Sequence, residues 1–280
     1  MAPRANLRWL LYGFLLAPIG MLVVLIYSIF LGRSNEAFVD VFCTEQACEC
    51  GDWYRRSVGN LQVENNVWNR GSLKSYQQCV SIAGSNDGVD AGWAWNWPGI
   101  RFNVVAYPNI TFGKNPWLGS TTLELPRQLK DVKCLEAKVD ISQIGTGKGN
   151  LSFDIWITRS LLSQPADITH EAMIWLSQDG TWPAGSRVET LIVDEREIEL
   201  WWKEKHSPSD EYQWSFLAFE YKDDFNKGTI RIHEFLNFLV TKGYISSDNY
   251  LASVELGNEI VSGHGQTLLR DYEVQFCEDD

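Results

Sequence analysis

The sequence has little positive charge. Its 280 residues include 24 Lys and Arg against 36 Asp and Glu, which leaves a formal net charge of -12. No run of basic residues occurs after residue 33. Because proteins that bind nucleic acids need basic side chains to neutralise phosphates, this composition argues against a nucleic-acid partner. It would not repel a neutral polysaccharide.

Charge is absent altogether from residues 9–31. This apolar stretch is long enough to cross a bilayer of about 30 Å as a helix. Arg4 and Arg8 precede it, and the acidic residues Glu36 and Asp40 follow it. The positive-inside rule therefore predicts a cytoplasmic N-terminus, with the remainder of the chain outside the cell. A cleaved signal peptide is the alternative, and it would also export the remainder.

Cysteine is scarce, and paired metal ligands are missing. The six cysteines are Cys43, Cys48, Cys50, Cys79, Cys134 and Cys277. An even number in an exported chain indicates disulfides, although spacing does not reveal which residues pair. The cluster at residues 43–50 has no second half made of Cys or His pairs, so we expect no metal site. Glycosylation sequons begin at Asn109 and Asn150.

Internal repeats and low-complexity runs are also absent, and short apolar segments alternate with Gly, Asn, Asp and Pro. This spacing is typical of an all-β sandwich or jelly roll. One segment differs, because Ile232, Phe235, Leu236 and Leu239 recur at helical spacing before Gly243. We predict one helix there, packed on the outside of the sheets.

These features divide the chain into three parts. Residues 1–33 are expected to form a cytoplasmic tip and transmembrane anchor, and residues 34–46 a polar tether. Residues 47–280 are expected to form one exported β domain, since β-sandwiches of more than 200 residues commonly fold as one unit.

Three segments, 153–157, 171–176 and 251–259, alternate aliphatic residues with polar or aromatic ones. Because successive residues of a strand face opposite sides, the aliphatic residues would point into a core. The opposite faces would carry Asp154 and Trp156, then Glu171, Met173 and Trp175, and finally Ser253, Glu255, Gly257 and Glu259. On one curved sheet, these residues would line a groove suited to sugars, which stack on Trp. An exposed sheet face with ordinary polar residues is the alternative.

Seven short motifs occur in an order that resembles glycoside hydrolase family 12, the β-jelly-roll endoglucanases. They are residues 50–53 (CGDW), 65–69 (NNVWN), 106–110 (AYPNI), 152–156 (SFDIW), 171–176 (EAMIWL), 183–185 (PAG) and 257–263 (GNEIVSG). The resemblance covers roughly residues 48–276. It implies a concanavalin-like jelly-roll sandwich in which a curved sheet forms the cleft.

The resemblance also implies roles for the residues that carry chemistry. Glu171 would be the nucleophile and Glu259 the acid/base, with Asp154 hydrogen-bonded beside Glu171. Asn66 and Trp68 would hold the sugar on the non-reducing side.

Further expectations concern the cleft wall and the N-terminal part of the domain. Met173 would lie near the reacting sugar, and Trp156 and Trp175 would line the cleft. Cys50 and Cys79 match the disulfide pair of the family.

Two departures from the family pattern bear on specificity. His170 stands where Tyr is common, and Ile260 with Val261 follows Glu259 where the family usually has an aromatic residue. They place fine specificity in doubt, especially on the side of the leaving group.

The implied activity is endo-acting hydrolysis of β-1,4-glucosidic bonds in cellulose-type or mixed-linkage β-glucans, with retention of configuration. No cofactor is needed, and the catalytic domain is expected to be a monomer. Xyloglucan is an alternative substrate. A membrane-anchored module that binds glucan without cleaving it is the alternative function, since fold alone does not settle function.

Overall fold

The structure is a computed structural model that describes residues 39–99, 101–206 and 211–277. The described strands are β1 (Arg55–Val58), β2 (Leu61–Glu64), β3 (Gln77–Gly84), β4 (Val89–Trp97), β5 (Asn109–Gly113), β6 (Arg127–Gln128), β7 (Glu136–Thr158), β8 (Ile168–Asp179), β9 (Ser186–Val193), β10 (Arg196–His206), β11 (Trp214–Tyr221), β12 (Lys227–Ile230) and β13 (Tyr250–Gln275). Two short 3-10 helices, η1 (Leu129–Asp131) and η2 (Pro165–Asp167), interrupt them.

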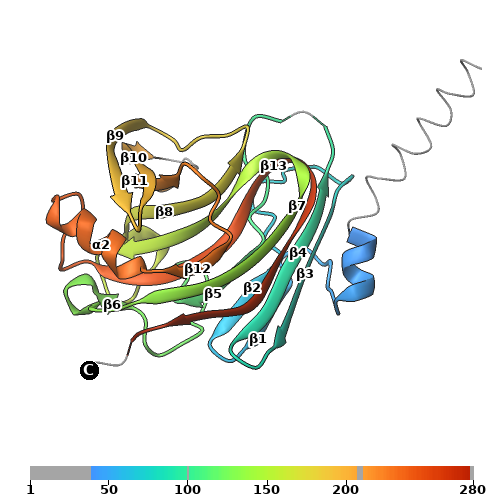
Figure 1. Ribbon diagram of the computed structural model, residues 1–280, viewed down its shortest axis with the longest axis horizontal. Helices are drawn as coiled ribbons and strands as arrows, with labels where there is room; N and C mark the ends of the chain where they lie inside the picture. The colour runs from blue at the N-terminus through green and yellow to red at the C-terminus, as the bar shows by residue number, and fades with distance from the viewer. Residues whose placement is uncertain (1–38, 100, 207–210, 278–280) are drawn as a thin grey trace, which may run out of the picture.

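Two long strands, β7 and β13, hold the two layers of the sandwich together. They pair antiparallel with each other along most of their length and bend from one layer into the other (Figure 1). The first half of β13 pairs with β5, and its second half pairs with β4. One layer therefore has the order β1-β2-β5-β13-β7-β8-β11-β10-β9, and the other contains β3, β4 and β12. The predicted all-β sandwich is confirmed.

The core lies between the layers and contains the aliphatic residues predicted from strand alternation. The apolar residues of β7, β8 and β13 buried there include Phe153, Ile155, Ile157, Ala172, Ile174, Leu176, Leu251, Val254 and Leu256. Ala252, expected in the core, instead packs with Trp156 and Trp214 on the opposite face, because a register shift between Leu251 and Ser253 interrupts the alternation. The residues between the core residues face the opposite side of the layer, because strand side chains alternate. The same alternation therefore builds both the core and the wall of the functional site.

The predicted helix is α2 (Ile232–Thr241), which covers one side of the sheets (Figure 1). It buries Ile232, Phe235, Leu236 and Leu239, as the helical spacing indicates. The helix ends before Gly243, which has a φ of 78°. Glycine adopts this left-handed conformation without the steric cost of a Cβ.

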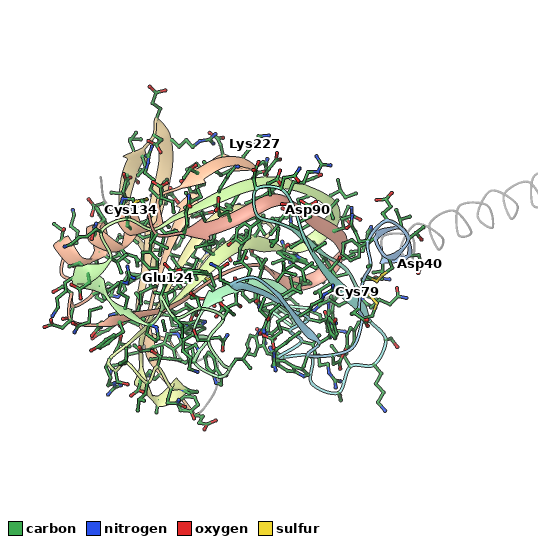
Figure 2. All side chains as sticks on the ribbon, turned by 90° about the horizontal axis from the view of Figure 1, so that it is seen from below. Asp40, Cys79, Asp90, Glu124, Cys134 and Lys227 are labelled. Carbon is green, nitrogen blue, oxygen red and sulfur yellow. A yellow bond between two sulfur atoms is a disulfide. The ribbon has the colours of Figure 1, made fainter. Side chains whose placement is uncertain are left out.

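The described end of the expected tether is a packed helix. Residues 39–45 are helical and lie at one end of the sandwich, where Asp40 is near Cys79 (Figure 2). Val39 and Phe42 are buried in a cluster with Cys79 and Ala94. Two apolar residues three positions apart share one helix face, so this segment packs on the domain where a polar tether was expected.

The predicted membrane anchor, residues 9–31, lies outside the described residues. Among the described residues, no helix is both long enough and apolar enough to cross a bilayer.

Three disulfides account for the six cysteines. Cys50 pairs with Cys79, as the resemblance implied, and the other pairs are Cys43–Cys48 and Cys134–Cys277. Cys134–Cys277 links the segment before β7 to the end of β13, across 143 positions of sequence. Closing so long a loop restricts the unfolded chain and stabilises the fold. In the described part of the chain, potential metal-ligand groups of three or more side chains occur only at these disulfides.

Candidate active site

The three predicted strands lie side by side in the order β13-β7-β8. In this register Ser253 is opposite Trp156, which is opposite Glu171. Glu255 is likewise opposite Asp154. The pairing therefore brings acidic and aromatic residues from distant parts of the sequence onto one face of a curved sheet.

A cleft of about 970 Å³ opens over this face. It is lined by the predicted site residues Asn66, Trp68, Asp154, Trp156, Glu171, Trp175 and Glu259. Met173 does not line it, because this side chain is buried in a cluster with Trp175, Phe216 and Ala218, and the Trp175 indole N–H donates to its sulfur at 3.4 Å. The structure thus brings together every predicted catalytic and sugar-binding residue except Met173.

Glu171 is held by an indole. Its side chain is buried, and Trp214 Nε1 donates a hydrogen bond of 2.6 Å to Glu171 Oε2. Trp214 is itself fixed edge-to-face against Trp156, with ring centroids 5.3 Å apart. Burial raises the pKa of Glu171 to about 8, the Trp214 bond opposes this, and repulsion from Glu259 and Glu255 adds to it.

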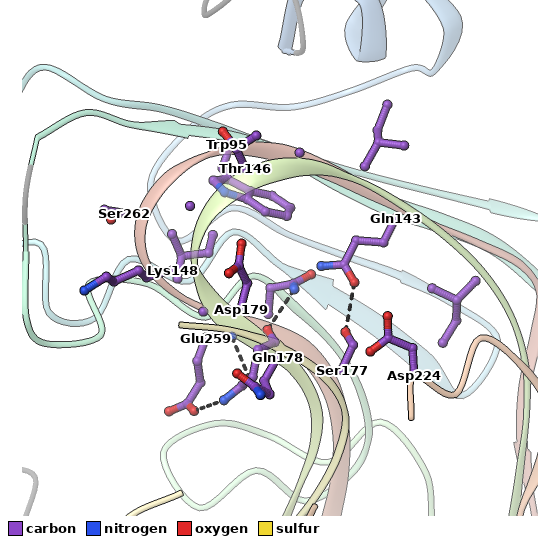
Figure 3. Close-up of a pocket in the computed structure, with 18 of the residues that line it drawn as sticks. Trp95, Gln143, Thr146, Lys148, Ser177, Gln178, Asp179, Asp224, Glu259 and Ser262 are labelled. Atoms are coloured by element: carbon purple, nitrogen blue, oxygen red, sulfur yellow. Dashed lines mark hydrogen bonds between the residues drawn. The ribbon is translucent and has the colours of Figure 1, made fainter. Parts of the chain in front are cut away.

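Glu259 is held by an amide. Asn150 Nδ2 donates a 2.5 Å hydrogen bond to Glu259 Oε2 (Figure 3). Asn150 Oδ1 in turn accepts a hydrogen bond from Ser152 Oγ at 3.0 Å. Burial raises the pKa of Glu259, and the Asn150 bond opposes the rise. Because the side chain of Asn150 is buried in this network, its sequon is not available for glycosylation in the folded protein.

Asp154 and Glu255 are two further carboxyl groups that line the cleft with Glu171 and Glu259. Burial, together with repulsion from Glu171, Glu255 and Glu259, raises the pKa of Asp154 well above its ordinary value. Glu255 Oε1 accepts hydrogen bonds of 2.9 Å from both Ser253 Oγ and Asn115 Nδ2. Burial raises the pKa of Glu255 to about 8. Strand alternation placed Glu255 on this face, but its burial could not be read from the sequence.

Glu255 gives a prediction for stability against pH. Its folded pKa lies above the ordinary 4.5, so folding takes up a proton. The contribution of Glu255 to the free energy of unfolding is then greatest below pH 4.5 and is lost as pH rises towards 8. Glu255→Gln keeps an acceptor for Ser253 and Asn115 but cannot ionise beside Asp154 or Glu64. We expect the variant to match the wild type at pH 4.5 and to exceed its free energy of unfolding by roughly 1–2 kcal/mol at pH 8. Denaturant unfolding of both proteins at both pH values checks this. The same difference in free energy of unfolding between variant and wild type at pH 4.5 and at pH 8 would contradict it.

Several cleft residues were not predicted as site residues. Trp53, Phe102, Trp117 and Trp182 line the cleft with exposed rings, and Trp214 lines it next to Glu171. Trp53 lies within the CGDW motif, which could have indicated it. The others lie in segments whose position depends on the tertiary structure, so composition alone did not separate them from core tryptophans.

A second hollow of about 490 Å³ lies behind Glu259, between the bend of β7 and β13 and the end of β8 (Figure 3). It is largely polar, and across it Ser177 Oγ donates to Gln143 Oε1 at 3.1 Å. It shares Gly149, Asn150 and Glu259 with the cleft. Glu171 and the exposed indoles line only the larger cleft, which is therefore the site with the chemistry.

A concave β-sandwich sheet that presents paired glutamates among exposed tryptophans defines a glycoside hydrolase, because the chemistry needs two carboxyl groups on either side of a sugar linkage. Residues 59–276 match the sequence model of Glycosyl hydrolase family 12, and the chain belongs to this family.

Known proteins are similar over most of the chain. Endoglucanase S of Pectobacterium parmentieri is 32% identical over 213 residues, which are 75% of this chain and 79% of that protein. A xyloglucan-specific endo-beta-1,4-glucanase A of Emericella nidulans is 26% identical over 80% of this chain and 89% of that protein. A family 12 xyloglucanase from Bacillus licheniformis superposes with a TM-score of 0.75 at 27% identity, covering 82% of this chain and 100% of that one.

Proposed function

We propose that the protein hydrolyses internal β-1,4-glucosidic bonds of cellulose-type or mixed-linkage β-glucans and so serves polysaccharide breakdown. The observation that carries the proposal is that Glu171 and Glu259 line one aromatic cleft, although 88 positions of sequence separate them. Membership of Glycosyl hydrolase family 12 supports it.

The chemistry assigned to the pair is a double displacement with retention. Glu171, ionised, attacks the anomeric carbon, while Glu259 gives its proton to the leaving oxygen. Glu259 then takes a proton from the incoming water, which breaks the bond between the sugar and Glu171. Two carboxyl groups that repel each other lose their protons one after the other, so over an interval of pH the pair holds a single proton. The first step requires this proton to be on Glu259, with Glu171 ionised.

Four further residues of the cleft bear on these steps. Trp214 stabilises the negative form of Glu171 through its indole N–H. Asp154 lines the same cleft, and repulsion between it and Glu171 is one cause of its raised pKa. The hydrogen bond to Glu171 that the resemblance implied is not formed in the structure, where Asp154 Oδ1 has no hydrogen-bond partner. Asn66 and Trp68 would bind the sugar on the non-reducing side, with Trp68 stacking on its ring.

Trp214→Phe tests the contact to the nucleophile. The variant keeps the ring against Trp156 but loses the N–H that favours ionised Glu171. Removing a donor to the charged form raises the pKa of Glu171, so the acid limb of the kcat/KM profile should move to higher pH. At pH 6 we expect kcat/KM to fall about ten-fold or more, with recovery as pH rises. A pH profile on soluble β-glucan measures both effects, and an unmoved acid limb would contradict the assignment.

Two substrate classes fit the cleft. Relatives named as an endoglucanase and as xyloglucan-specific endoglucanases both match the chain, and our proposal places unbranched β-glucan first. Product analysis by mass spectrometry on cellulose-type, mixed-linkage and xyloglucan substrates decides between them. The substrate with the highest kcat/KM identifies the class, and a strong preference for xyloglucan would overturn our order.

A glucan-binding module without catalysis is the competing function. The buried, hydrogen-bonded carboxyl groups favour an enzyme, because binding alone gains nothing from burying charge at such a cost. An assay for new reducing ends separates the two readings. Binding to β-glucan without new ends would favour the module.

We also propose that residues 9–31 anchor the protein in the membrane, with a monomeric catalytic domain outside the cell. The uncharged stretch and the Arg residues before it support this arrangement. Membrane fractionation, together with the mass of the mature chain, tests it. A soluble chain that lacks this stretch would show cleavage, and a cross-linked dimer would contradict the monomer.

A further inference from the structure

The loop after β8 presents the most exposed tryptophan of the cleft. Trp182 is 72% exposed, compared with 43% for Trp68 and 48% for Trp117. An indole in water leaves a large apolar surface uncovered, which is unfavourable unless a ligand covers it. The ring therefore marks a place where an apolar, flat surface is available to a ligand in the cleft.

The loop that carries Trp182 is firmly attached on both sides of it. Thr181 Oγ1 donates a 2.9 Å hydrogen bond to the carbonyl oxygen of Gly149, the residue before Asn150. Pro183 is buried, and Ala184 packs against the apolar cluster beneath the cleft. The indole is thus exposed on a fixed segment, so a ligand would bind it without first having to order the loop.

The position of Trp182 in the sheet assigns it to one side of the reacting bond. Trp68 follows β2, on one side of the β13–β7 pair, and Trp182 follows β8, on the other side. Glu259 lies on β13, between them. A glucan whose non-reducing part lies on Trp68 must therefore place its leaving part towards Trp182.

The residues that follow Glu259 offer the leaving sugar no aromatic platform. The two residues that follow Glu259 are the aliphatic Ile260 and Val261. Val261 lines the cleft wall but is almost fully buried. On this side, among the described residues, Trp182 is the strongly exposed ring that lines the cleft.

We infer that Trp182 determines specificity on the leaving-group side by stacking on the glucose unit that departs in the first step and on an acceptor sugar in the second. This inference rests on the proposed hydrolase function. It places substrate recognition in the 180–185 loop, in addition to Asn66 and Trp68 on the other side.

The test compares two substrates for Trp182→Ala. β-Cellotriosyl fluoride has three glucose units for the non-reducing side, and its leaving group is fluoride, so it needs no sugar platform beyond the bond that breaks. Cellohexaose and soluble β-glucan do need one. We expect kcat/KM to fall about ten-fold on the glucans and to stay within about two-fold on the fluoride. Trapping of the glycosyl-enzyme by added cellobiose should fall by a similar factor.

Two further variants make the test specific. Trp182→Phe retains a stacking ring and should recover most of the activity on glucans. Ile192→Ala removes an exposed apolar side chain from β9, outside the cleft. It should leave kcat/KM unchanged for both substrates. Equal losses on the fluoride and the glucans, or no loss on either, would overturn the role of Trp182. A wild-type protein that releases neither reducing ends nor fluoride would instead overturn the hydrolase function itself, and this inference with it.

Discussion

Glu171→Gln is expected to lower kcat on soluble β-glucan by at least ~10³-fold, the largest effect of any single substitution in the chain. The amide has nearly the shape of the carboxyl group and can still accept the hydrogen bond from Trp214. It cannot attack an anomeric carbon as a carboxylate does, so no glycosyl-enzyme forms. Binding of cellohexaose should persist, because the aromatic lining of the cleft is unchanged. Initial rates of reducing-end release, with calorimetry for binding, measure both.

A matched control is available on the same sheet. Glu220 is also a buried glutamate, and it accepts a 2.9 Å hydrogen bond from Trp201 Nε1. It does not line the cleft. Glu220→Gln should therefore retain activity within about two-fold. If Glu171→Gln kept wild-type turnover, or if both variants lost it equally, Glu171 would not be the nucleophile.

Glu259→Ala should lower kcat/KM on β-glucan by about 10²–10⁴-fold, since a sugar leaving group needs a proton. A dinitrophenyl cellobioside has a leaving group that departs without one, so its first step should survive. The glycosyl-enzyme on Glu171 then reacts only with a nucleophile that needs no general base. Added azide should restore turnover by attacking the anomeric carbon, and the product should be a β-glycosyl azide with retained configuration.

Two comparisons make this result decisive. Azide should not rescue Glu171→Gln with retention, because that variant forms no intermediate. Product configuration is read by proton NMR of the anomeric centre. Equal losses on β-glucan and on the dinitrophenyl glycoside, without rescue by azide, would remove the acid/base role from Glu259. An α-glycosyl azide would instead indicate a single displacement, and the assignment of retention would be wrong.

Local sequence patterns were reliable wherever one residue and its near neighbours determine the outcome. Alternation predicted which side chains of β7 and β8, and of β13 from Ser253 to Glu259, enter the core and which do not, because a strand repeats every two residues. It was wrong for Ala252, where a register shift interrupts β13. Helical spacing predicted α2 for the same kind of reason. The tether was different, because whether Val39 and Phe42 pack on the domain depends on the surface that Cys79 and Ala94 offer them.

The chemical partners of the site required the tertiary structure. The donors to Glu171 and Glu259 are Trp214 and Asn150, which are 43 and 109 positions away in sequence. Nothing in either local pattern identifies such a donor, because strand order in the sheet decides which side chains meet. Met173 shows the converse case: its motif is present, but the side chain is buried in a cluster with Trp175 and Phe216.

By itself, the sequence determined the all-β class, the two cleft-facing glutamates and the family, since each depends on periodicity or on ordered motifs. Only the tertiary structure decided that Asp154, Glu171, Glu255 and Glu259 line one cleft, which cysteines pair, and that Trp182 stays uncovered. The physical reason is that burial, pairing and exposure depend on contacts between segments far apart in the chain, and the folding of β7 and β13 through both layers sets those contacts.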